Sequence, residues 1–425
     1  MAHQPVGTTP RDEPDHLVAT APQRLPLFAL LAANAISLIG GTLTLVALPW
    51  FVLQTTGSAA QTGITAGFAA LPNFLSGVFG GVLVDRLGGK RMSVVADLVS
   101  GLGIAAIPFF YLTVGLAFWQ LLGLVLITEL LAIPGLTARR AILPELAQRG
   151  GFRLEQVNSW FEGIQSLALL LGPPIAGLLI AWLGPSQVLW IDAATFAVSA
   201  AIVGLAIPGP GAAVMVAARR VRRRFWQELL AGWRFLRADR LLLGLAITLA
   251  ITNFAGAPFY AVVLPVYAED AYGRATALGL LISASGAGSL AGALLYGSFG
   301  HRFSRRLLFI GGFALADATW LALILPPSLP LVAALLAVGG LAAGPLNPLL
   351  VTVRHERIPD ALRGRVFSTF SAITAIVSPI GMVITGAAIE TIGLRSTVAL
   401  LAGTSLCAVL SLSFIPVFHQ LARAE

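Results

Sequence analysis

Charged residues are scarce in this chain, and their scarcity excludes an ordinary soluble fold. Only 11% of the 425 residues are charged, whereas 57% are hydrophobic and the mean hydropathy is +0.87. Soluble domains carry about 25% charged residues. The single cysteine, Cys407, excludes a disulfide or a thiolate metal site within one chain. Phosphate-binding loops, nucleophile elbows and metal-ligand spacings are also missing from the sequence, so we predict no cofactor, no metal and no enzymatic activity.

The sequence has instead a series of long apolar runs between Leu25 and Phe418. Each run is long enough to cross an apolar core about 30 Å thick. Because that core contains no water, every backbone group must bond within its own segment, which predicts helices. Turn signals such as Gly184-Pro185-Ser186 separate the runs. Twelve spans are predicted, at 25–54, 62–84, 92–113, 118–138, 156–183, 188–207, 241–268, 275–298, 306–325, 329–353, 366–390 and 396–418.

Basic residues lie almost entirely in the loops on one side of these spans. Of the 27 Lys and Arg residues, only Arg274 and Arg395 fall in loops on the other side. Positively charged loops stay in the cytoplasm, so both termini are predicted to be cytoplasmic. We therefore expect a multi-pass protein of the bacterial inner (plasma) membrane. The formal charge of +8 then needs no nucleic-acid partner to explain it.

Four regions are predicted along the chain. Residues 1–24 lack an apolar run and read as a disordered cytoplasmic tail rather than a cleaved signal peptide. Six-helix bundles are expected at 25–207 and at 241–425, the second ending in a short tail. Residues 208–240 between them form a basic cytoplasmic linker, which we expect to bind anionic lipid. Aromatic and aliphatic residues at helical spacing from Phe225 to Leu236 indicate an interfacial helix within it.

Internal repetition supports the division into two halves. The segment Gly81–Arg91 after the second span recurs 216 residues later as Gly297–Arg306 after the eighth. The segment Ile142–Glu145 after the fourth span recurs 215 residues later as Arg357–Asp360 after the tenth. The sequence therefore indicates two related six-helix units joined by the basic linker.

The segment Gly81–Arg91 resembles the signature loop of the major facilitator superfamily. The resemblance implies an all-α membrane protein of the major facilitator fold, with 12 transmembrane helices in two six-helix halves. It also implies that Asp85 and Arg86 form a charge network that stabilises the outward-open state. The second copy has His301 where the first has its acid. With Asp97 on the next span, the predicted conformational latch comprises Gly81, Asp85, Arg86, Gly88, Lys90, Arg91 and Asp97.

Further segments resemble the drug and siderophore exporters of this superfamily, which include the enterobactin, macrolide and Tap-type multidrug efflux proteins. The resembling segments are Ala47–Trp50, Ala141–Leu146, Val157–Ser159 and Leu362–Val366, and the run from Thr137 to Gly184 is most similar to Tap-type pumps. The resemblance implies a secondary active transporter that exports amphipathic small molecules by proton antiport with alternating access. A dedicated siderophore or secreted-metabolite exporter is the alternative. Relatives often have an aspartate where this chain has Gly41.

The direction of transport has one further indication in the fifth span. Gly172, Pro173 and Gly177 match the glycine-rich motif of superfamily antiporters, with Ala176 in place of one glycine. Small residues let helices approach closely and proline allows a bend, so these three residues are predicted to form a gate helix. Ordinary tight packing between helices is the alternative interpretation.

Five acidic residues lie inside the predicted spans, away from the span ends, and no Lys or Arg is predicted at a similar depth. Ionisable groups in a span are costly and are functional candidates. Glu129, near the middle of the fourth span, is predicted to couple transport to protons or cations, with a structural ion pair as the alternative. Asp317 is the second candidate, with a structural partner as the alternative. The other acids are Asp97, expected to pair with Arg86 or Arg91; Glu162, expected to pair with Arg139 or Arg140; and Asp192, near the outer face.

Polar and aromatic residues on the presumed cavity helices are candidates for the substrate path. By the family resemblance, the first, fourth, seventh and tenth spans line the cavity. Hydrogen bonding between helices is the alternative role for each. The candidates are Asn34, Gln54, Asn253, Phe254, Tyr260 and Asn347. The expected partners are therefore a small-molecule substrate, protons and membrane lipids, and the chain is expected to be a monomer.

Overall fold

The computed structural model describes residues 23–208, 225–325 and 328–422, and every regular element in that part of the chain is a helix. Side chains are not described at 73–82, 85, 225–229, 301, 361, 419 and 422. Most of the predicted N-terminal tail and the basic run Arg219–Arg224 therefore lie outside the described residues.

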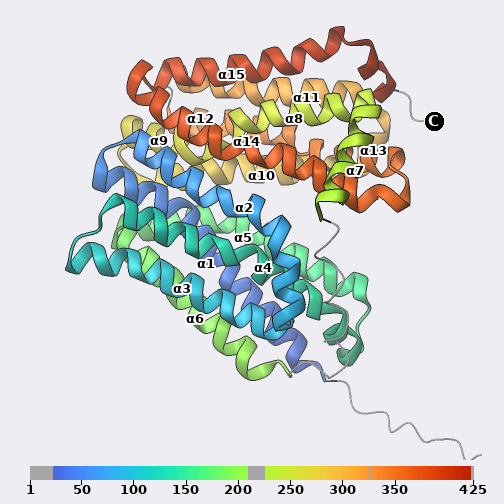
Figure 1. Cartoon of the computed structure of the whole chain (residues 1–425). Helices are drawn as coiled ribbons and strands as arrows, with labels where there is room; N and C mark the ends of the chain where they lie inside the picture. The colour runs from blue at the N-terminus through green and yellow to red at the C-terminus, as the bar shows by residue number, and fades with distance from the viewer. Residues whose placement is uncertain (1–22, 209–224, 326–327, 423–425) are drawn as a thin grey trace, which may run out of the picture.

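The N half is a bundle of six long helices that alternate in direction (Figure 1). Glycines end several of them, and Gly57 closes the first helix in the left-handed conformation with φ of 65°, which costs glycine no Cβ clash. We name the two ends of the molecule by α1, as the Leu25 end and the Gly57 end. The helices are α1 (Leu25–Thr56), α2 (Ala59–Leu87), α3 (Gly89–Thr113), α4 (Phe118–Gly150), α5 (Leu154–Leu183) and α6 (Pro185–Ala206).

The C half repeats this arrangement with more interruptions. Its first span is broken by a π-helical turn, η2, and its fourth is broken at Gly344-Pro345. Its elements are α8 (Arg240–Pro258), η2 (Phe259–Val263), α9 (Leu264–Tyr272), α10 (Ala275–Phe299), η3 (Gly300–Arg302), α11 (Arg305–Trp320), η4 (Leu321–Ile324), α12 (Leu329–Ala343), α13 (Leu346–Arg357), η5 (Asp360–Leu362), α14 (Arg363–Ile392), α15 (Leu394–Ser411), η6 (Leu412–Phe414) and η7 (Pro416–Ala422).

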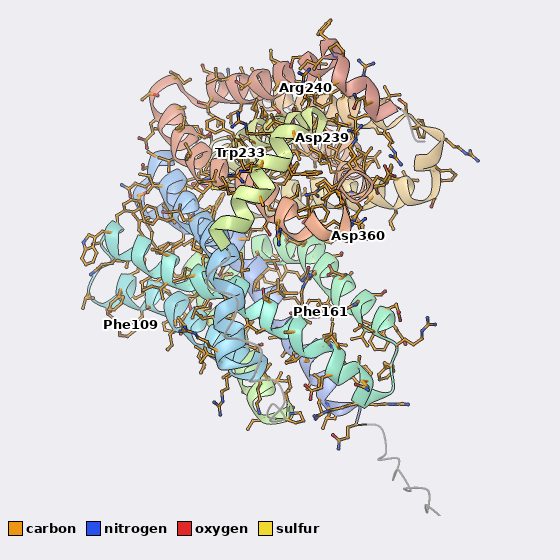
Figure 2. All side chains as sticks on the ribbon, turned by 45° about the vertical axis from the view of Figure 1, so that its right-hand side comes forward. Phe109, Phe161, Trp233, Asp239, Arg240 and Asp360 are labelled. Carbon is orange, nitrogen blue, oxygen red and sulfur yellow. The ribbon has the colours of Figure 1, made fainter. Side chains whose placement is uncertain are left out.

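In chain order, α7 (Phe225–Ala238) connects the two halves, and it falls in the region where the sequence indicates an interfacial helix. It packs across the Leu25 end of α14, where a methyl group added to Gly232 would come within 2.6 Å of the Arg365 carbonyl oxygen. Asp239 ends the helix, accepts hydrogen bonds from the backbone of α8 and lies 3.3 Å from an Arg357 nitrogen. Figure 2 shows Trp233 on α7 and the turn at Asp239 and Arg240.

The predicted membrane fold is confirmed, with one correction to the span boundaries. Within the described residues, eleven helical stretches are long and apolar enough to cross a membrane, and α2 completes the twelve. The predicted end of the fourth span at 138 is wrong, because α4 continues to Gly150. Leu143, Leu146 and Ala147 on that extension are buried in one cluster with α1, and this burial favours further helix over a loop.

The halves share an apolar core at the Gly57 end and have separate cores at the Leu25 end. One cluster joins α1 residues such as Phe51 and Leu53 to Val263 and Val266 of the C half. Toward the Leu25 end, one cluster contains only N-half residues, and another contains C-half residues together with Leu236 of α7. Figure 1 shows the two bundles stacked, with α2 beside α14. Among the described residues, the core therefore holds the halves together at one end only.

Glycines allow close backbone contact at helix crossings, both between the halves and within one half. Between the halves, a methyl group on Gly63 of α2 would lie 2.4 Å from the Met382 carbonyl oxygen of α14. Within the C half, α10 and α12 meet through four glycines, Gly288, Gly292, Gly340 and Gly344. A methyl group added to any one of them would lie 2.0–2.2 Å from a backbone oxygen on the opposite side of the contact. Helices that meet without intervening side chains are held at a fixed separation.

Gly63→Ala is expected to destabilise the protein by about 1–3 kcal/mol, because the methyl group meets backbone that cannot rotate away. Gly123→Ala on α4 is the matched control, since nothing lies within 4 Å of the position of its added Cβ. Thermal unfolding of the purified protein in detergent measures both. Equal melting temperatures for the two variants would contradict the close crossing.

Candidate functional site

A buried ion pair links four helices of the N half. The Arg139 side chain on α4 is 4% exposed and the Asp97 side chain on α3 is 6% exposed. One terminal nitrogen of Arg139 lies 2.6 Å from both carboxylate oxygens of Asp97. Ser199 on α6 accepts from Arg139 at 2.9 Å and donates to Asp97 at 2.7 Å. Arg139 also donates to Ser93 of α3 at 3.1 Å and to the Asn34 side-chain oxygen of α1 at 3.3 Å.

This network corrects three of the sequence predictions. Asp97 pairs with Arg139 and not with Arg86 or Arg91, which are exposed. A basic residue does lie at the depth of the acids, because α4 extends past its predicted end and carries Arg139 inside the bundle. Asn34 is fully buried beside Arg139 and is thereby excluded from the surface of a cavity.

The remaining latch candidates lie at the Leu25 end of α2 and α3. Lys90 donates to the Ile207 carbonyl at the end of α6, at 2.5 Å, which compensates the negative end of that helix dipole. Gly88 forms the turn between α2 and α3 with φ of 77°. Gly81 and Asp85 belong to α2, but their side-chain positions lie outside the described residues. The structure thus joins Lys90 and Asp97 to α6, by two separate contacts.

Glu162, the other acid predicted to pair with a basic residue, forms such a pair. Arg140 lies 2.9 Å from Glu162, which confirms one of the two predicted partners, and both side chains are about half exposed. Adjacent residues of α4 therefore carry two different ion pairs. Arg139 is buried against Asp97, whereas Arg140 points outward to α5.

Glu129 lies half-buried on α4 without a counter-ion. Among the described residues, no hydrogen bond or ion pair reaches its carboxylate. The charged group that acts on it is another acid, Asp192 of α6. Asp192 is fully buried and accepts hydrogen bonds from Thr44 of α1 and Thr195 of α6. A carboxylate in this environment is stable only if a proton or a cation neutralises it.

The C half has a pocket that collects three of the predicted residues. It has a volume of about 320 Å³ and lies between α8, η2, α11 and α12. Asp317, Asn253 and Tyr260 line it, together with Trp320 and Phe313. Asp317 is 3% exposed and accepts a hydrogen bond of 2.5 Å from Ser405 of α15. Tyr260 bonds Ser285 of α10 at 2.8 Å, and Asn253 donates to the Thr374 carbonyl of α14 at 3.2 Å.

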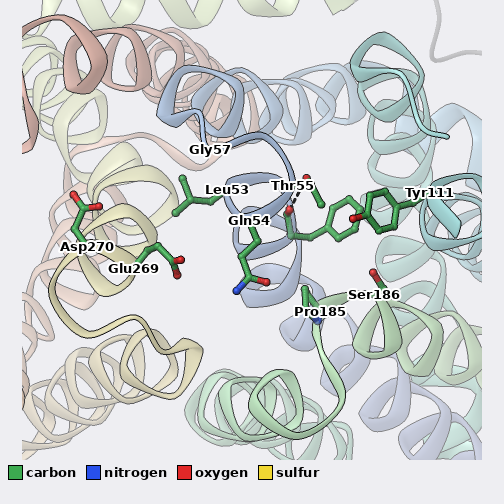
Figure 3. A pocket seen from close by; sticks show the side chains of 10 residues that line it. Leu53, Gln54, Thr55, Gly57, Tyr111, Pro185, Ser186, Glu269 and Asp270 are labelled. Atoms are coloured by element: carbon green, nitrogen blue, oxygen red, sulfur yellow. Dashed lines mark hydrogen bonds between the residues drawn. The ribbon is translucent and has the colours of Figure 1, made fainter.

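The last three cavity candidates are dispersed. Gln54 lies at the Gly57 end, in a second pocket that also contains Glu269 and Asp270 (Figure 3). Phe254 is half-buried at the contact between α8 and α14, and Asn347 is exposed on α13. The structure therefore groups Asn253, Tyr260 and Asp317 in one pocket, and Gln54, Phe254 and Asn347 do not line it.

The predicted gate residues lie at contacts between helices. Two of them, Pro173 and Gly177, lie at the seam between the halves, which is the contact of α5 with α10. A methyl group on Gly177 of α5 would lie 2.8 Å from the Ala275 carbonyl oxygen of α10, and one on Gly279 of α10 would lie 2.3 Å from that of Pro173. Gly172 instead packs on Thr42 of α1. Small residues on α5 thus set the distance between the halves near the Gly57 end.

A hydrogen-bonded contact that the sequence analysis missed joins the halves at the same end. Glu390 of α14 accepts from the Ser58 hydroxyl at 2.5 Å and from the Ala60 backbone N–H at 3.1 Å. It caps the N-terminus of α2 from the other half, a position where a negative charge is stabilising. Only Ser58 before the apolar run was readable from sequence, since the partner lies 332 residues away.

Known proteins resemble this chain in sequence and in structure. The family model described as Major Facilitator Superfamily matches residues 30–273 and 248–421. The chain is 32% identical over 411 residues to the multidrug efflux pump Tap of Mycolicibacterium fortuitum, covering 95% of this chain and 98% of that protein. It is 24% identical over 377 residues to macrolide efflux protein A of Streptococcus pyogenes, covering 88% and 91%.

The fold also has solved counterparts. A crystal structure of a mutant of the nucleoside transporter NupG matches with a TM-score of 0.77 at 14% identity, covering 94% of this chain and 100% of that chain. At that identity the likeness is one of fold. The sequence matches confirm the resemblance that the signature segment and the exporter-like segments indicate.

Asp97→Asn is expected to destabilise the protein by about 3–5 kcal/mol, because it leaves Arg139 charged and buried without its partner. Combining it with Arg139→Met removes both charges and should recover part of the loss. Glu162→Gln breaks the exposed neighbouring pair and should cost less than about 1 kcal/mol. Thermal unfolding in detergent ranks the four proteins. Equal losses for Asp97→Asn and Glu162→Gln would contradict a buried pair.

Proposed function

The chain belongs to the major facilitator superfamily, a family of transporters rather than enzymes, and from that premise we propose that it exports amphipathic small molecules from the cytoplasm. The observation that carries the proposal is its similarity to the multidrug efflux pump Tap over nearly the full length of both chains. The substrates would be drugs or compounds like them. The exporter is driven by an ion gradient, with protons exchanged for substrate.

Alternating access is the mechanism that the packing of the halves supports. The shared apolar core holds the halves together at the Gly57 end and leaves each with its own core at the Leu25 end. Because the basic loops lie at the Leu25 end, the positive-inside rule places that end in the cytoplasm. In this proposal, the described state is the one open to the cytoplasm, and export requires the halves to part at the Gly57 end.

Contacts at both ends of the molecule control that parting. The glycine crossings of α2 with α14 and of α5 with α10 act as the surfaces on which the halves rock. Glu390 capping α2 holds the Gly57 end closed. At the Leu25 end, the signature segment with Asp85, Arg86 and Arg91 stabilises the opposite state, and Lys90 and Asp97 tie it to α6.

Glu129 carries the proton in this proposal. It is half-buried in a span, it lacks a counter-ion among the described residues, and Asp192 adds a second negative charge nearby. A carboxylate without a counter-ion is costly in a span, and a bound proton removes its charge. Opening to the outer, proton-rich side loads the proton, and opening to the cytoplasm releases it.

Glu129→Gln is expected to abolish uptake of a lipophilic cation into everted vesicles driven by a pH gradient, because the amide cannot release a proton. Glu162→Gln, which removes an exposed acid from α5, is the control and should keep wild-type uptake. Uptake is followed by fluorescence quenching of the cation. Unchanged uptake in Glu129→Gln would remove this residue from coupling. Uptake confined to one iron chelator would favour the dedicated siderophore exporter.

Glu390→Gln is expected to weaken closure at the Gly57 end, because a neutral amide caps α2 less strongly than a carboxylate does. The carboxylate is exposed and screened by water, so we expect the open population to rise by a factor of about two to five. A cysteine introduced as Val266→Cys, which is 5% exposed, reports the opening in a Cys407→Ser background. Its labelling rate by a membrane-impermeant maleimide should rise, and Glu162→Gln should leave it unchanged.

A constant labelling rate in Glu390→Gln would contradict the role of Glu390 in closing the Gly57 end. Ser58→Ala provides a second test from the other partner, since it removes one of the two hydrogen bonds that Glu390 accepts. Its effect should have the same sign.

A further inference from the structure

The pocket of the C half contains a buried acid without a positive partner. Among the described residues, one hydrogen bond reaches the Asp317 carboxylate, from Ser405, and no Lys, Arg or His pairs with it. The pocket beside it is not sealed, since Tyr260 on its wall is 38% exposed. A carboxylate in such surroundings needs a proton or a cation to offset the loss of water.

The N half shows how the same arrangement is neutralised. In each half, an acid on the third helix accepts a hydroxyl hydrogen bond from a serine on the sixth, Ser199 for Asp97 and Ser405 for Asp317. In the N half, the guanidinium of Arg139 completes the site. The two halves therefore contain related sites, and one of them lacks its cation.

The residue that corresponds to Arg139 in the C half makes its contacts away from Asp317. Shifting Arg139 by the 215-residue offset of the repeat leads to Arg354. Arg354 bonds the Leu350 carbonyl of its own helix at 3.1 Å, and its guanidinium lies over the rings of Phe367 and Phe370. Asp317 is also about one turn further along its helix than Asp97, because the two acids are 220 residues apart and not 216.

The pocket beside Asp317 has room for a cation and is lined by aromatic side chains. Trp320 and Phe313 line the pocket, and Trp320 is fixed by stacking on Phe259 with centroids 4.3 Å apart. Aromatic faces attract organic cations, especially where water is excluded. The wall also contains backbone irregularities, the π-helical turn η2 with Tyr260 and the end of α12 at Ala343. Such interruptions recur at binding sites within transport proteins.

We propose that this pocket binds a monovalent organic cation, whose guanidinium or ammonium group pairs with Asp317 while its apolar part lies against Trp320 and Phe313. The bound group takes the place that Arg139 occupies in the N half. The proposal rests on the proposed export function, because it assigns the charged end of a substrate to the C half. The volume of about 320 Å³ suits a small cation or the charged end of a larger one.

Benzylguanidinium tests the site directly, with neutral benzylurea as a control of nearly the same shape. Binding to the purified full chain in detergent is measured by isothermal titration calorimetry, without any transport step. We expect benzylguanidinium to bind the wild-type protein and benzylurea to bind at least about tenfold more weakly. Asp317→Asn should remove this difference. Equal binding of the two probes to the wild-type protein, or no binding of either, would overturn the proposal.

A second variant fills the pocket and leaves the carboxylate in place, in case Asp317→Asn does not fold. A methyl group on Gly256 of α8 would lie 3.6 Å from the Trp320 ring, so Gly256→Leu projects into the pocket. It should abolish benzylguanidinium binding. Gly123→Leu on α4, in open surroundings, should retain it. Retained binding in Gly256→Leu would place the probe elsewhere and overturn the assignment.

The binding assay and the vesicle assay fail independently. If benzylguanidinium does not bind but lipophilic cations are still exported, the site is wrong and the export function stands. If the probe binds as expected but no substrate is exported, the site stands and the transport proposal fails.

Discussion

The exclusion of water from the membrane interior is the constraint on which the rest of this structure depends. It makes every span a helix, and it makes every charge within a span costly unless another group compensates it. The Asp97–Arg139 pair shows the most complete compensation among the described residues. Four helices supply its hydrogen bonds, from Asn34, Ser93 and Ser199 as well as the two charged residues. Breaking it exposes an uncompensated charge, so the pair fixes how α1, α3, α4 and α6 pack.

The other buried acids are distinguished by how far this compensation goes. Asp192 has two threonine hydroxyls, Asp317 has one serine hydroxyl and a pocket, and Glu129 has no hydrogen-bond partner among the described residues. In our proposals, this order also separates the acids with structural roles from those with functional roles. A carboxylate whose charge is fully compensated loses stability if it exchanges its partner. A carboxylate whose charge is incompletely compensated can take up and release a proton or a cation.

The sequence predicted the helices well because the requirements of a span are local. Length, apolar composition and turn residues are properties of each segment, and the repeat offset shows the duplication without any structure. The partners of the buried charges are not local. Asp97 and Arg139 are 42 residues apart, and the pairing depends on α4 continuing past its predicted end. The apolar spacing of Leu143, Leu146 and Ala147 was the signal that could have revealed this extension.

The glycine crossing of α10 and α12 has a mechanical consequence for the C half. Backbones in direct contact cannot slide or separate without losing their packing, so these two helices behave as a single lever. One arm of the lever bears on the N half, where Gly279 of α10 meets Pro173. The other arm forms part of the pocket wall, through Gly339 and Ala343 of α12. A force applied to the pocket wall is therefore transmitted to the seam, without any intervening loop.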